Sequence, residues 1–143
     1  MPFIVINRSM DPMSRDECLQ RLAENQVGRL AVSVHGQPVI FPVNYVLEGD
    51  VVVFRNDPGT KLDSATLARV AFEVDQIDVE QKSGWSVVVQ GFGRNITDAV
   101  DRPSERRRSL PLEAWAPGEK EHWVEILEPR ISGRRLDTVT VSS

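Results

Sequence analysis

Residues 51–62 read Val-Val-Val-Phe-Arg-Asn-Asp-Pro-Gly-Thr-Lys-Leu, and the rest of the chain is organised around this stretch. It begins with three β-branched residues and a phenylalanine, a composition that predicts a strand. Asn-Asp-Pro-Gly is typical of a tight turn, because proline presets φ and glycine accepts a positive φ. We expect a short helix over residues 62–67. The turn would then bring backbone N–H groups and the partial positive charge of a helix N-terminus together.

Three side chains at this turn suit an anion. Arg55, Thr60 and Lys61 supply a guanidinium fork, a hydroxyl and an ammonium, which together could hold a phosphate group. The stretch is not a Walker loop, because it lacks the spaced glycines and the Gly-Lys-Ser/Thr ending. Two interpretations stay open: a phosphate site, or a basic turn on the surface.

Length and composition indicate one folded domain of 143 residues, 41% of them hydrophobic. We assign residues 1–143 to this domain, with a core over 13–136 and a tail over 137–143 that is expected to be disordered from 138 onward. A single cysteine excludes an intrachain disulfide and fits a cytoplasmic setting. The net charge of −4 argues against general nucleic-acid binding, and neither a membrane span nor a signal peptide is predicted.

A helix is predicted to begin at the capping box formed by Ser14 and Glu17, and to end near Asn25. Cys18 and Leu22 belong to an apolar stripe at helical spacing on this segment. We therefore interpret Cys18 as a core residue rather than a nucleophile.

Six strands are predicted from residue alternation and from the turns between them. They cover residues 28–34, 38–47, 51–54, 69–79, 85–96 and 121–136. Pro42 marks either an edge or a bulge in the second strand, and Gly91 and Gly93 suit a strongly bent fifth strand. Short strands with few helices predict an antiparallel barrel or sandwich.

Residues 98–110 are polar, and we expect them to be helical. This segment contains four arginines interleaved with acidic residues, so we interpret it as a solvated helix face rather than a basic patch. The arginines are Arg102, Arg106, Arg107 and Arg108.

The sequence assigns no catalytic residue and no metal site. The only histidines, His35 and His122, lack metal-ligand spacing with each other or with the cysteine. The carboxylates are scattered, with no isolated pair to propose as acid and base. An enzyme of this kind would take its reactivity from an organic cofactor.

Five pieces of the chain occur in an informative order. They are Gly-Arg-Leu-Ala-Val at 28–32, Pro-Val-Asn-Tyr at 42–45, Phe-Arg-x4-Thr-Lys at 54–61, Gly-Trp-Ser-Val-Val-Val-x-Gly at 84–91 and Ile-Ser-Gly-Arg-Arg at 131–135. In this order and spacing the chain resembles the pyridoxamine 5′-phosphate oxidase-like, FMN-binding split-barrel family, and most closely its small actinobacterial members. The resemblance runs from about residue 13 to residue 136.

This resemblance implies a mainly β fold, a six-stranded antiparallel Greek-key split β-barrel with a few short helices, which forms a homodimer. It also implies an FMN-dependent oxidoreductase, with the cofactor at the subunit interface and a small-molecule substrate. The phosphate would lie against the 55–61 turn and the isoalloxazine ring along residues 42–45. The implied cofactor-binding residues are Pro42, Val43, Asn44, Tyr45, Phe54, Arg55, Thr60, Lys61, Trp85, Ser86 and Arg134.

Some features depart from the larger members of the family. The chain lacks their C-terminal extension and their substrate-binding arginine and histidine pattern, so vitamin B6 oxidation is not expected. Since related small barrels use a deazaflavin or bind haem, two alternatives remain: a deazaflavin-dependent reductase, or a non-catalytic flavin or haem carrier or sensor. Tyr45 and Arg134 are expected to contact substrate. The three tryptophans are expected to anchor the dimer interface or to fill the core: Trp85, Trp115 and Trp123.

Overall fold

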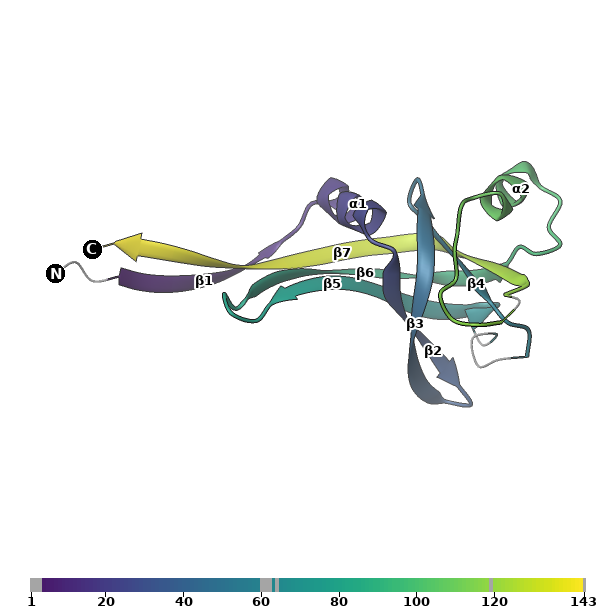
Figure 1. The fold of residues 1–143 in the computed structure, drawn as a ribbon, viewed down its shortest axis with the longest axis horizontal. Helices are drawn as coiled ribbons and strands as arrows, with labels where there is room; N and C mark the ends of the chain where they lie inside the picture. Colours follow the sequence, from purple (N-terminus) through teal and green to yellow (C-terminus); the bar gives the residue numbers. More distant parts are fainter. Residues whose placement is uncertain (1–3, 60–62, 64, 119, 143) are drawn as a thin grey trace.

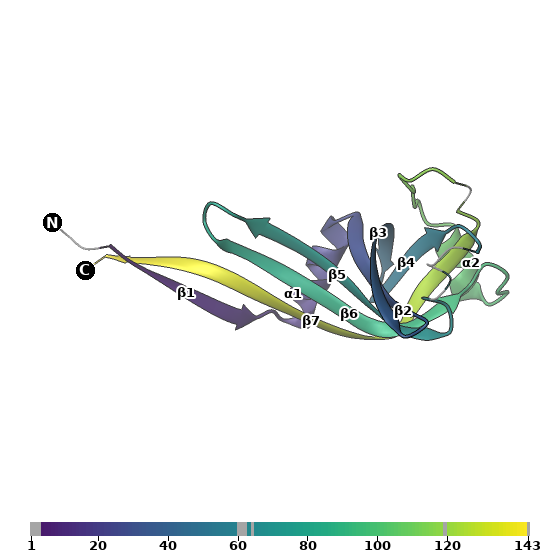
Figure 2. The same cartoon turned by 90° about the horizontal axis from the view of Figure 1, so that it is seen from below.

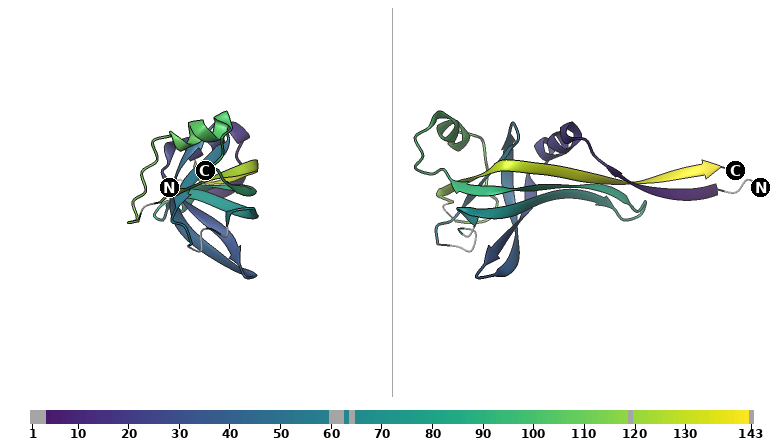
Figure 3. Two further views of the ribbon diagram at one scale, coloured as in Figure 1. Left: turned by 90° about the vertical axis from the view of Figure 1, so that its right-hand side faces the viewer. Right: turned by 180° about the vertical axis from the view of Figure 1, so that it is seen from behind.

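A computed structural model describes residues 4–59, 63, 65–118 and 120–142 of the chain. The two helices of this part are α1 (Arg15–Glu24) and α2 (Arg102–Arg108). Its strands are β1 (Ile4–Pro12), β2 (Val27–Val34), β3 (Gln37–Glu48), β4 (Val51–Asn56), β5 (Ala68–Asp78), β6 (Ser83–Asn95) and β7 (His122–Ser142). Both helices lie on one side of the long strands, opposite the tip of the β2–β3 hairpin (Figures 1 and 3).

Six of the seven described strands close into a ring, and the pairs between them are antiparallel. The sheet runs in the order β1-β7-β4-β3-β2-β5-β6, and β6 pairs back onto β7. Between β2 and β5 the ring is closed over only three residues of each strand, 29–31 and 71–73. The predicted mainly β split barrel is confirmed, but the sheet has seven strands instead of six.

The additional strand is β1, which pairs with the C-terminal part of β7 from Pro12↔Arg134 to Ile4↔Ser142. Within the described chain, β7 beyond Leu136 pairs with β1 alone. The two strands form a ribbon that projects from the barrel and carries both termini at its end (Figure 2). Residues 137–142, expected to form a tail, thus belong to β7. Their Thr-Val-Thr-Val sequence favours an extended backbone.

The capping box at the start of α1 is half formed. The Ser14 hydroxyl accepts a hydrogen bond from the Glu17 N–H at 3.2 Å, as predicted. The Glu17 carboxylate does not return to the cap but pairs with Arg135 of β7 at 2.6 Å. This ion pair ties the first turn of α1 to the base of the β1–β7 ribbon.

The six predicted strands are all present at the predicted places. The β2–β3 register runs without a break past Pro42, which pairs with Arg29, while β4 pairs only with residues 45–48 of β3. Pro42 therefore lies on an edge and not at a bulge. The bend in β6 is confirmed by a register shift between Gln90 and Phe92. At Gly93, a Cβ atom would lie 1.8 Å from the Ala65 carbonyl oxygen, so the close approach of that segment requires glycine.

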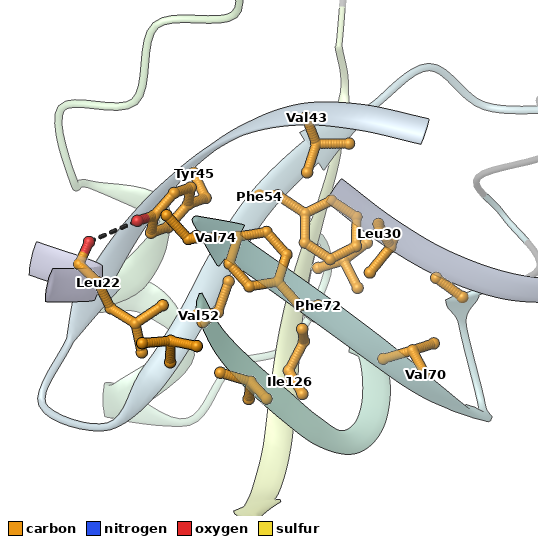
Figure 4. Packing of buried hydrophobic residues seen from close by; sticks show 14 of the residues in the cluster. Leu22, Leu30, Val43, Tyr45, Val52, Phe54, Val70, Phe72, Val74 and Ile126 are labelled. Carbon is orange, nitrogen blue, oxygen red and sulfur yellow. Dashed lines mark hydrogen bonds between the residues drawn. The ribbon is translucent and has the colours of Figure 1, made fainter. Parts of the chain in front are cut away.

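The core fills the barrel with alternate residues of its strands (Figure 4). Leu30, Phe72 and Val89 face one another across β2, β5 and β6 in the register and are fully buried. Cys18 and Leu22 of α1 close one end of this cluster. The prediction that Cys18 is a core residue is confirmed, and burial raises the pKa of its thiol.

Of the four arginines expected to be solvated, Arg102 and Arg106 are exposed, whereas Arg107 and Arg108 are partly buried and bound to other groups. Arg107 lies between Glu48 and the fully buried Glu125, and it contacts both carboxylates. Arg108 donates to the carbonyl oxygens of Ile96 and Ala99 at 2.6 and 2.8 Å. The sequence did not show this role, because the buried acidic partner lies on a distant strand. These contacts fasten a helix of seven residues to the barrel.

The helix expected over residues 62–67 can be compared with the structure only in part, because residues 62 and 64 lie outside the described residues. Asp63, Ala65 and Thr66 form a tight turn, in which the Thr66 N–H donates to the Asp63 carbonyl oxygen at 3.0 Å. Leu67 then takes a positive φ of 55° and leads directly into β5.

Candidate functional site

Seven of the eleven predicted cofactor residues line two separate hollows. The first, here called the β3–β4 pocket, is lined by Pro42, Val43 and Asn44 of β3 and by Arg55 of β4, and its volume is about 80 Å³. Residues of the segment that leads into β7 form its other wall: Leu112, Ala114, Ala116 and Lys120. The structure thus brings four of the predicted residues together in one place.

Two hydrogen bonds hold the 112–120 segment over this pocket. The Asn44 side-chain oxygen accepts from the Trp115 N–H at 2.8 Å, and the Arg55 Nε donates to the Lys120 carbonyl oxygen at 3.0 Å. The Arg55 guanidinium also lies over the Trp123 ring, 4.8 Å from its centre. Among the described residues, a carbonyl group and an aromatic face hold Arg55 in place.

The side chain of Asp63 stabilises the turn that follows Arg55. Its carboxylate accepts hydrogen bonds from the Asn56 amide at 2.7 Å and from the Gly59 N–H, and it lies 3.1 Å from His122 Nδ1. Burial acts to raise the pKa of Asp63, but these hydrogen bonds lower it below its usual value. Asp63 is thus an ionised anchor of the turn. Thr60 and Lys61, the other predicted phosphate ligands, lie outside the described residues.

The second hollow, here called the outer-face groove, lies between the β5–β6 hairpin and the base of the β1–β7 ribbon. Its volume is about 660 Å³, and Ser86 of β6 and Arg134 of β7 lie opposite each other on its floor. Its walls carry exposed apolar side chains, of which Met10, Ile77 and Val79 are 59%, 64% and 80% exposed. The groove therefore has an apolar wall and a cationic, hydrogen-bonding floor.

Trp85 lies at the rim of this groove but points to the opposite face of β6. It is 8% exposed, and the Arg21 guanidinium of α1 lies 5.3 Å from the centre of its ring. Trp123 is half-buried beneath Arg55, whereas Trp115 is 64% exposed. Trp85 therefore packs in the core, whereas most of the Trp115 side chain is exposed to solvent in the single chain.

Two of the predicted cofactor residues lie in the core. Phe54 is fully buried, and Tyr45 is 2% exposed, with its hydroxyl donating to the Leu22 carbonyl oxygen at 2.5 Å. The Tyr45 ring packs edge-on against Phe72, 4.8 Å between ring centres. Burial raises the pKa of Tyr45. The expectation that Tyr45 contacts substrate does not fit this arrangement, because its polar group already has a partner inside the barrel.

A charged cluster that the sequence analysis missed lies beside the outer-face groove. Glu73 and Asp75 of β5 are both contacted by Arg29 Nη1 of β2, at 3.1 and 3.4 Å. Paired residues of a sheet share a face, and Asp75 pairs with Ser86, which pairs with Arg134. Burial, followed by the hydrogen bond and the charge of Asp75, raises the pKa of Glu73 to about 7. Glu73 and Asp75 are two positions apart in a predicted strand, so their side chains lie on one face. This spacing could have revealed the cluster from the sequence.

No group of three or more histidine, cysteine or acidic side chains in the described ranges could hold a metal ion. Among the same residues, no helix has the length and apolar character needed to cross a membrane.

A family model described as pyridoxamine 5′-phosphate oxidase matches residues 14–135. An uncharacterized protein of Mycobacterium tuberculosis is 31% identical over 97 residues, and the match spans 64% of this chain and 64% of that relative's length. An FAD-binding protein from Mycobacterium smegmatis is 35% identical, with a TM-score of 0.73 over 87% of this chain and 98% of that one. An FAD-binding protein from Mesorhizobium loti is 28% identical, with a TM-score of 0.69 over 88% and 97% of the two chains.

The resemblance inferred from the five sequence pieces is therefore confirmed. By its matched residues, its fold and its relatives, this chain belongs to the pyridoxamine 5′-phosphate oxidase-like split-barrel family.

Proposed function

We propose that this protein is a homodimeric flavin-dependent oxidoreductase that binds its cofactor between two subunits. In this arrangement, the β3–β4 pocket of one subunit faces the outer-face groove of the other. A bound flavin would supply hydride or electron transfer, and the residues of the chain would bind it, orient it and keep water away. The substrate is a small molecule whose identity the groove does not specify.

One observation carries this proposal: the predicted flavin residues are divided between two hollows that have no lining residue in common. Ligand sites usually enclose about 300–1,000 Å³. The β3–β4 pocket, at about 80 Å³, is too small alone, while the outer-face groove, at about 660 Å³, is large but has one uncovered apolar wall. A two-fold axis that brings one hollow against the other would complete two equivalent sites.

The residues have separate roles in the proposed site. Arg55 and Lys61 bind the flavin phosphate through charge-assisted hydrogen bonds. The backbone of residues 42–44 faces the polar edge of the ring, and Ser86 and Arg134 of the other subunit contact the ring or the substrate. Relatives that are named FAD-binding proteins support a flavin in general. FMN is the form that the family resemblance implies, and it must be compared directly with FAD.

Cofactor titration tests the proposal. We expect the purified protein to bind FMN or FAD more tightly than riboflavin or a deazaflavin, and to show a flavin absorption spectrum. Reduction of the bound flavin by NADH or NADPH, followed by reoxidation with an acceptor, would demonstrate turnover. Tight binding without any reduction would instead favour a carrier or sensor.

The phosphate contact has a separate test. Each charge-assisted hydrogen bond contributes about 1.5–3 kcal/mol, so Arg55→Gln and Lys61→Gln should each weaken FMN about ten-fold or more while leaving riboflavin unchanged. Arg102→Gln is the matched control, because Arg102 is exposed and lies on α2, away from both hollows. Equal losses for FMN and riboflavin would contradict the assignment of the phosphate to this turn.

A further inference from the structure

The 112–120 segment carries an exposed tryptophan on the side that faces away from its own subunit. Every second residue at the start of this segment lines the β3–β4 pocket: Leu112, Ala114 and Ala116. Glu113 and Trp115 lie between them and line neither this pocket nor the outer-face groove. The alternation therefore places Glu113 and Trp115 on the outer side of the segment, where a molecule approaching the pocket would meet them first.

This tryptophan is held in position although most of its side chain is exposed. Trp115 is 64% exposed, and its backbone N–H donates to the Asn44 side-chain oxygen at 2.8 Å. At the other end of the segment, the Lys120 ammonium lies 2.7 Å from the Asp57 carboxylate, in the turn after β4. Exposed tryptophans that are already held in place are favoured as centres of protein–protein interfaces, because little conformational freedom is lost when they are buried.

The outer-face groove offers an apolar surface that suits an indole ring. Ile77 and Val79 are 64% and 80% exposed on its wall, at the end of the β5–β6 hairpin. A buried indole N–H also needs an acceptor, and the Asp78 carboxylate lines the same groove. Ser86 and Arg134 lie on the floor, so an indole against this wall would leave the floor to a cofactor.

The two surfaces also differ in charge. Glu113 is exposed, whereas the cations Lys82 and Arg134 line the groove. Over the ranges that the structure describes, no ion pair involves any of these three side chains. Asp78, the acidic member of the described lining, accepts a hydrogen bond from the backbone of its own turn at 3.0 Å. The groove lining is therefore net positive and complements an indole with an acidic neighbour.

We propose that Trp115 and Glu113 of one subunit dock in the outer-face groove of a second copy of this chain. Trp115 packs against the apolar wall, and Glu113 lies toward Lys82. Because one chain carries both complementary surfaces, a two-fold axis forms the contact twice. The proposal rests on the dimer of the proposed function, in which the β3–β4 pocket faces the partner's groove. It adds the side chains that hold the two hollows together and leaves the groove floor to the flavin.

Sedimentation of the full-length apoprotein at several concentrations measures the dimer dissociation constant without any cofactor. We expect Trp115→Ala to raise this constant at least ten-fold, and Trp115→Phe to raise it less, since phenylalanine keeps part of the aromatic area. Leu67→Ala is the control, because Leu67 is 75% exposed and lines neither hollow. Circular dichroism should show the wild-type fold in all three variants. Equal dissociation constants for the wild type and Trp115→Ala would overturn the docking contact.

Exchange of charges tests which part of the partner Glu113 meets. Glu113→Lys and Lys82→Glu should each weaken the dimer about three-fold, as expected for an exposed ion pair. The combined variant, which has the net charge of the wild type, should recover the wild-type dissociation constant. Additive losses in the combined variant would contradict the placement of Glu113 near Lys82.

Cross-linking separates the groove contact from a contact between two Trp115 side chains at the symmetry axis. Chains with Trp115→Cys and chains with Val79→Cys are mixed and treated with a short bismaleimide, and the native Cys18 is buried. We expect cross-linked dimers in the mixture and none in either variant alone. Cross-linking of Trp115→Cys by itself would overturn the groove contact.

Flavin titration of the same proteins separates this proposal from the proposed function. A dimer that depends on Trp115 but binds no flavin would uphold the docking contact and refute the proposed function. A flavin-binding dimer whose association does not depend on Trp115 would refute the docking contact alone. A wild type that stays monomeric would refute both the docking contact and the interface site.

Discussion

At the scale of single residues, Tyr45 lies in the predicted strand, but the hydroxyl that was expected to contact substrate is bound to Leu22 inside the barrel. The family pattern correctly marks residues 42–45 as one strand, but strand alternation turns Tyr45 into the barrel. Tyr45→Phe should destabilise the protein by about 1–2 kcal/mol in urea unfolding, because the Leu22 carbonyl loses the hydroxyl that it accepts from. Cofactor affinity should not change. A large loss of flavin affinity without loss of stability would return Tyr45 to the site.

Glu73 predicts a pH dependence of stability. Its folded pKa of about 7 lies above the ordinary value of 4.5, so between these pH values the folded protein holds a proton that the unfolded chain has released. The free energy of unfolding should therefore fall as pH rises from 4.5 to 7. The loss should be on the order of 1 kcal/mol, because the side chain is partly exposed.

Urea unfolding at pH 5 and pH 8 checks this expectation. The charged groups that face Glu73 are Arg29 from β2 and Asp75 from its own strand, with Arg134 beyond Ser86. Glu73→Gln should flatten the decline, whereas Glu80→Gln, an exposed carboxylate on the β5–β6 turn, should leave it unchanged. An unaltered decline in Glu73→Gln would assign the pH dependence to another group.

These residues also mark how far sequence reasoning reached. The roles of Ser14 and Cys18 could be predicted because a cap and an apolar stripe are local patterns. The Arg29–Glu73 pair could not, because its members are 44 positions apart and meet only through strand pairing. The family resemblance named Ser86 and Arg134 separately as cofactor residues, and the strand register shows that they lie opposite each other.

At the scale of elements, α2 depends on charge and not on an apolar face. One of its contacts with the barrel is the pair between Arg107, 14% exposed, and Glu125, which is fully buried on β7. Breaking a buried ion pair costs about 3–5 kcal/mol, since one charge is left without compensation. Arg107→Met should approach the lower end of this range, because Arg94 still lies 3.3 Å from Glu125. Hydrogen exchange should show faster opening of α2 and of the segment that follows it.

Two further variants separate the charge pair from the helix itself. Arg107→Met combined with Glu125→Leu should recover most of the stability, because an apolar pair of similar volume can replace a buried ion pair. Arg102→Gln, on the same helix, should leave the exchange rates unchanged. Equal destabilisation by the single and double substitutions would show that packing, and not the uncompensated charge, holds α2 in place.

The strands also show that local sequence patterns can be predicted whereas pairing between distant segments cannot. Alternation and turn residues predicted all six strands of the ring, since each is a local pattern along the chain. The β1–β7 ribbon was missed because each of its strands, read alone, is a short terminal segment that looks like a tail. Pairing with the other terminus makes it a structural element.

At the scale of the whole molecule, one chain leaves two features incomplete. Seven residues predicted to bind flavin are divided between two hollows, and an apolar wall containing Met10, Ile77 and Val79 is exposed beside one of them. The predicted flavin residues came from the family resemblance, which could not show their division between two hollows because that depends on how the barrel closes. The apolar wall was not predicted. Both features are explained if a second copy covers the outer face.

The final prediction tests this assembly through the linkage between dimer and cofactor. If flavin binds only the dimer, diluting the apoprotein should weaken flavin binding, and adding flavin should shift sedimentation toward the dimer. Ile77→Asp with Val79→Asp places charges in the proposed interface, so it should raise the dimer dissociation constant at least ten-fold and weaken flavin at low protein concentration. Val100→Asp is the control, because Val100 is 85% exposed but does not line either hollow. Excess flavin should restore dimers of the charged variant, since each ligand bound at the interface favours association. A protein that sediments as a monomer at micromolar concentration and still binds one flavin per chain would refute the interface site.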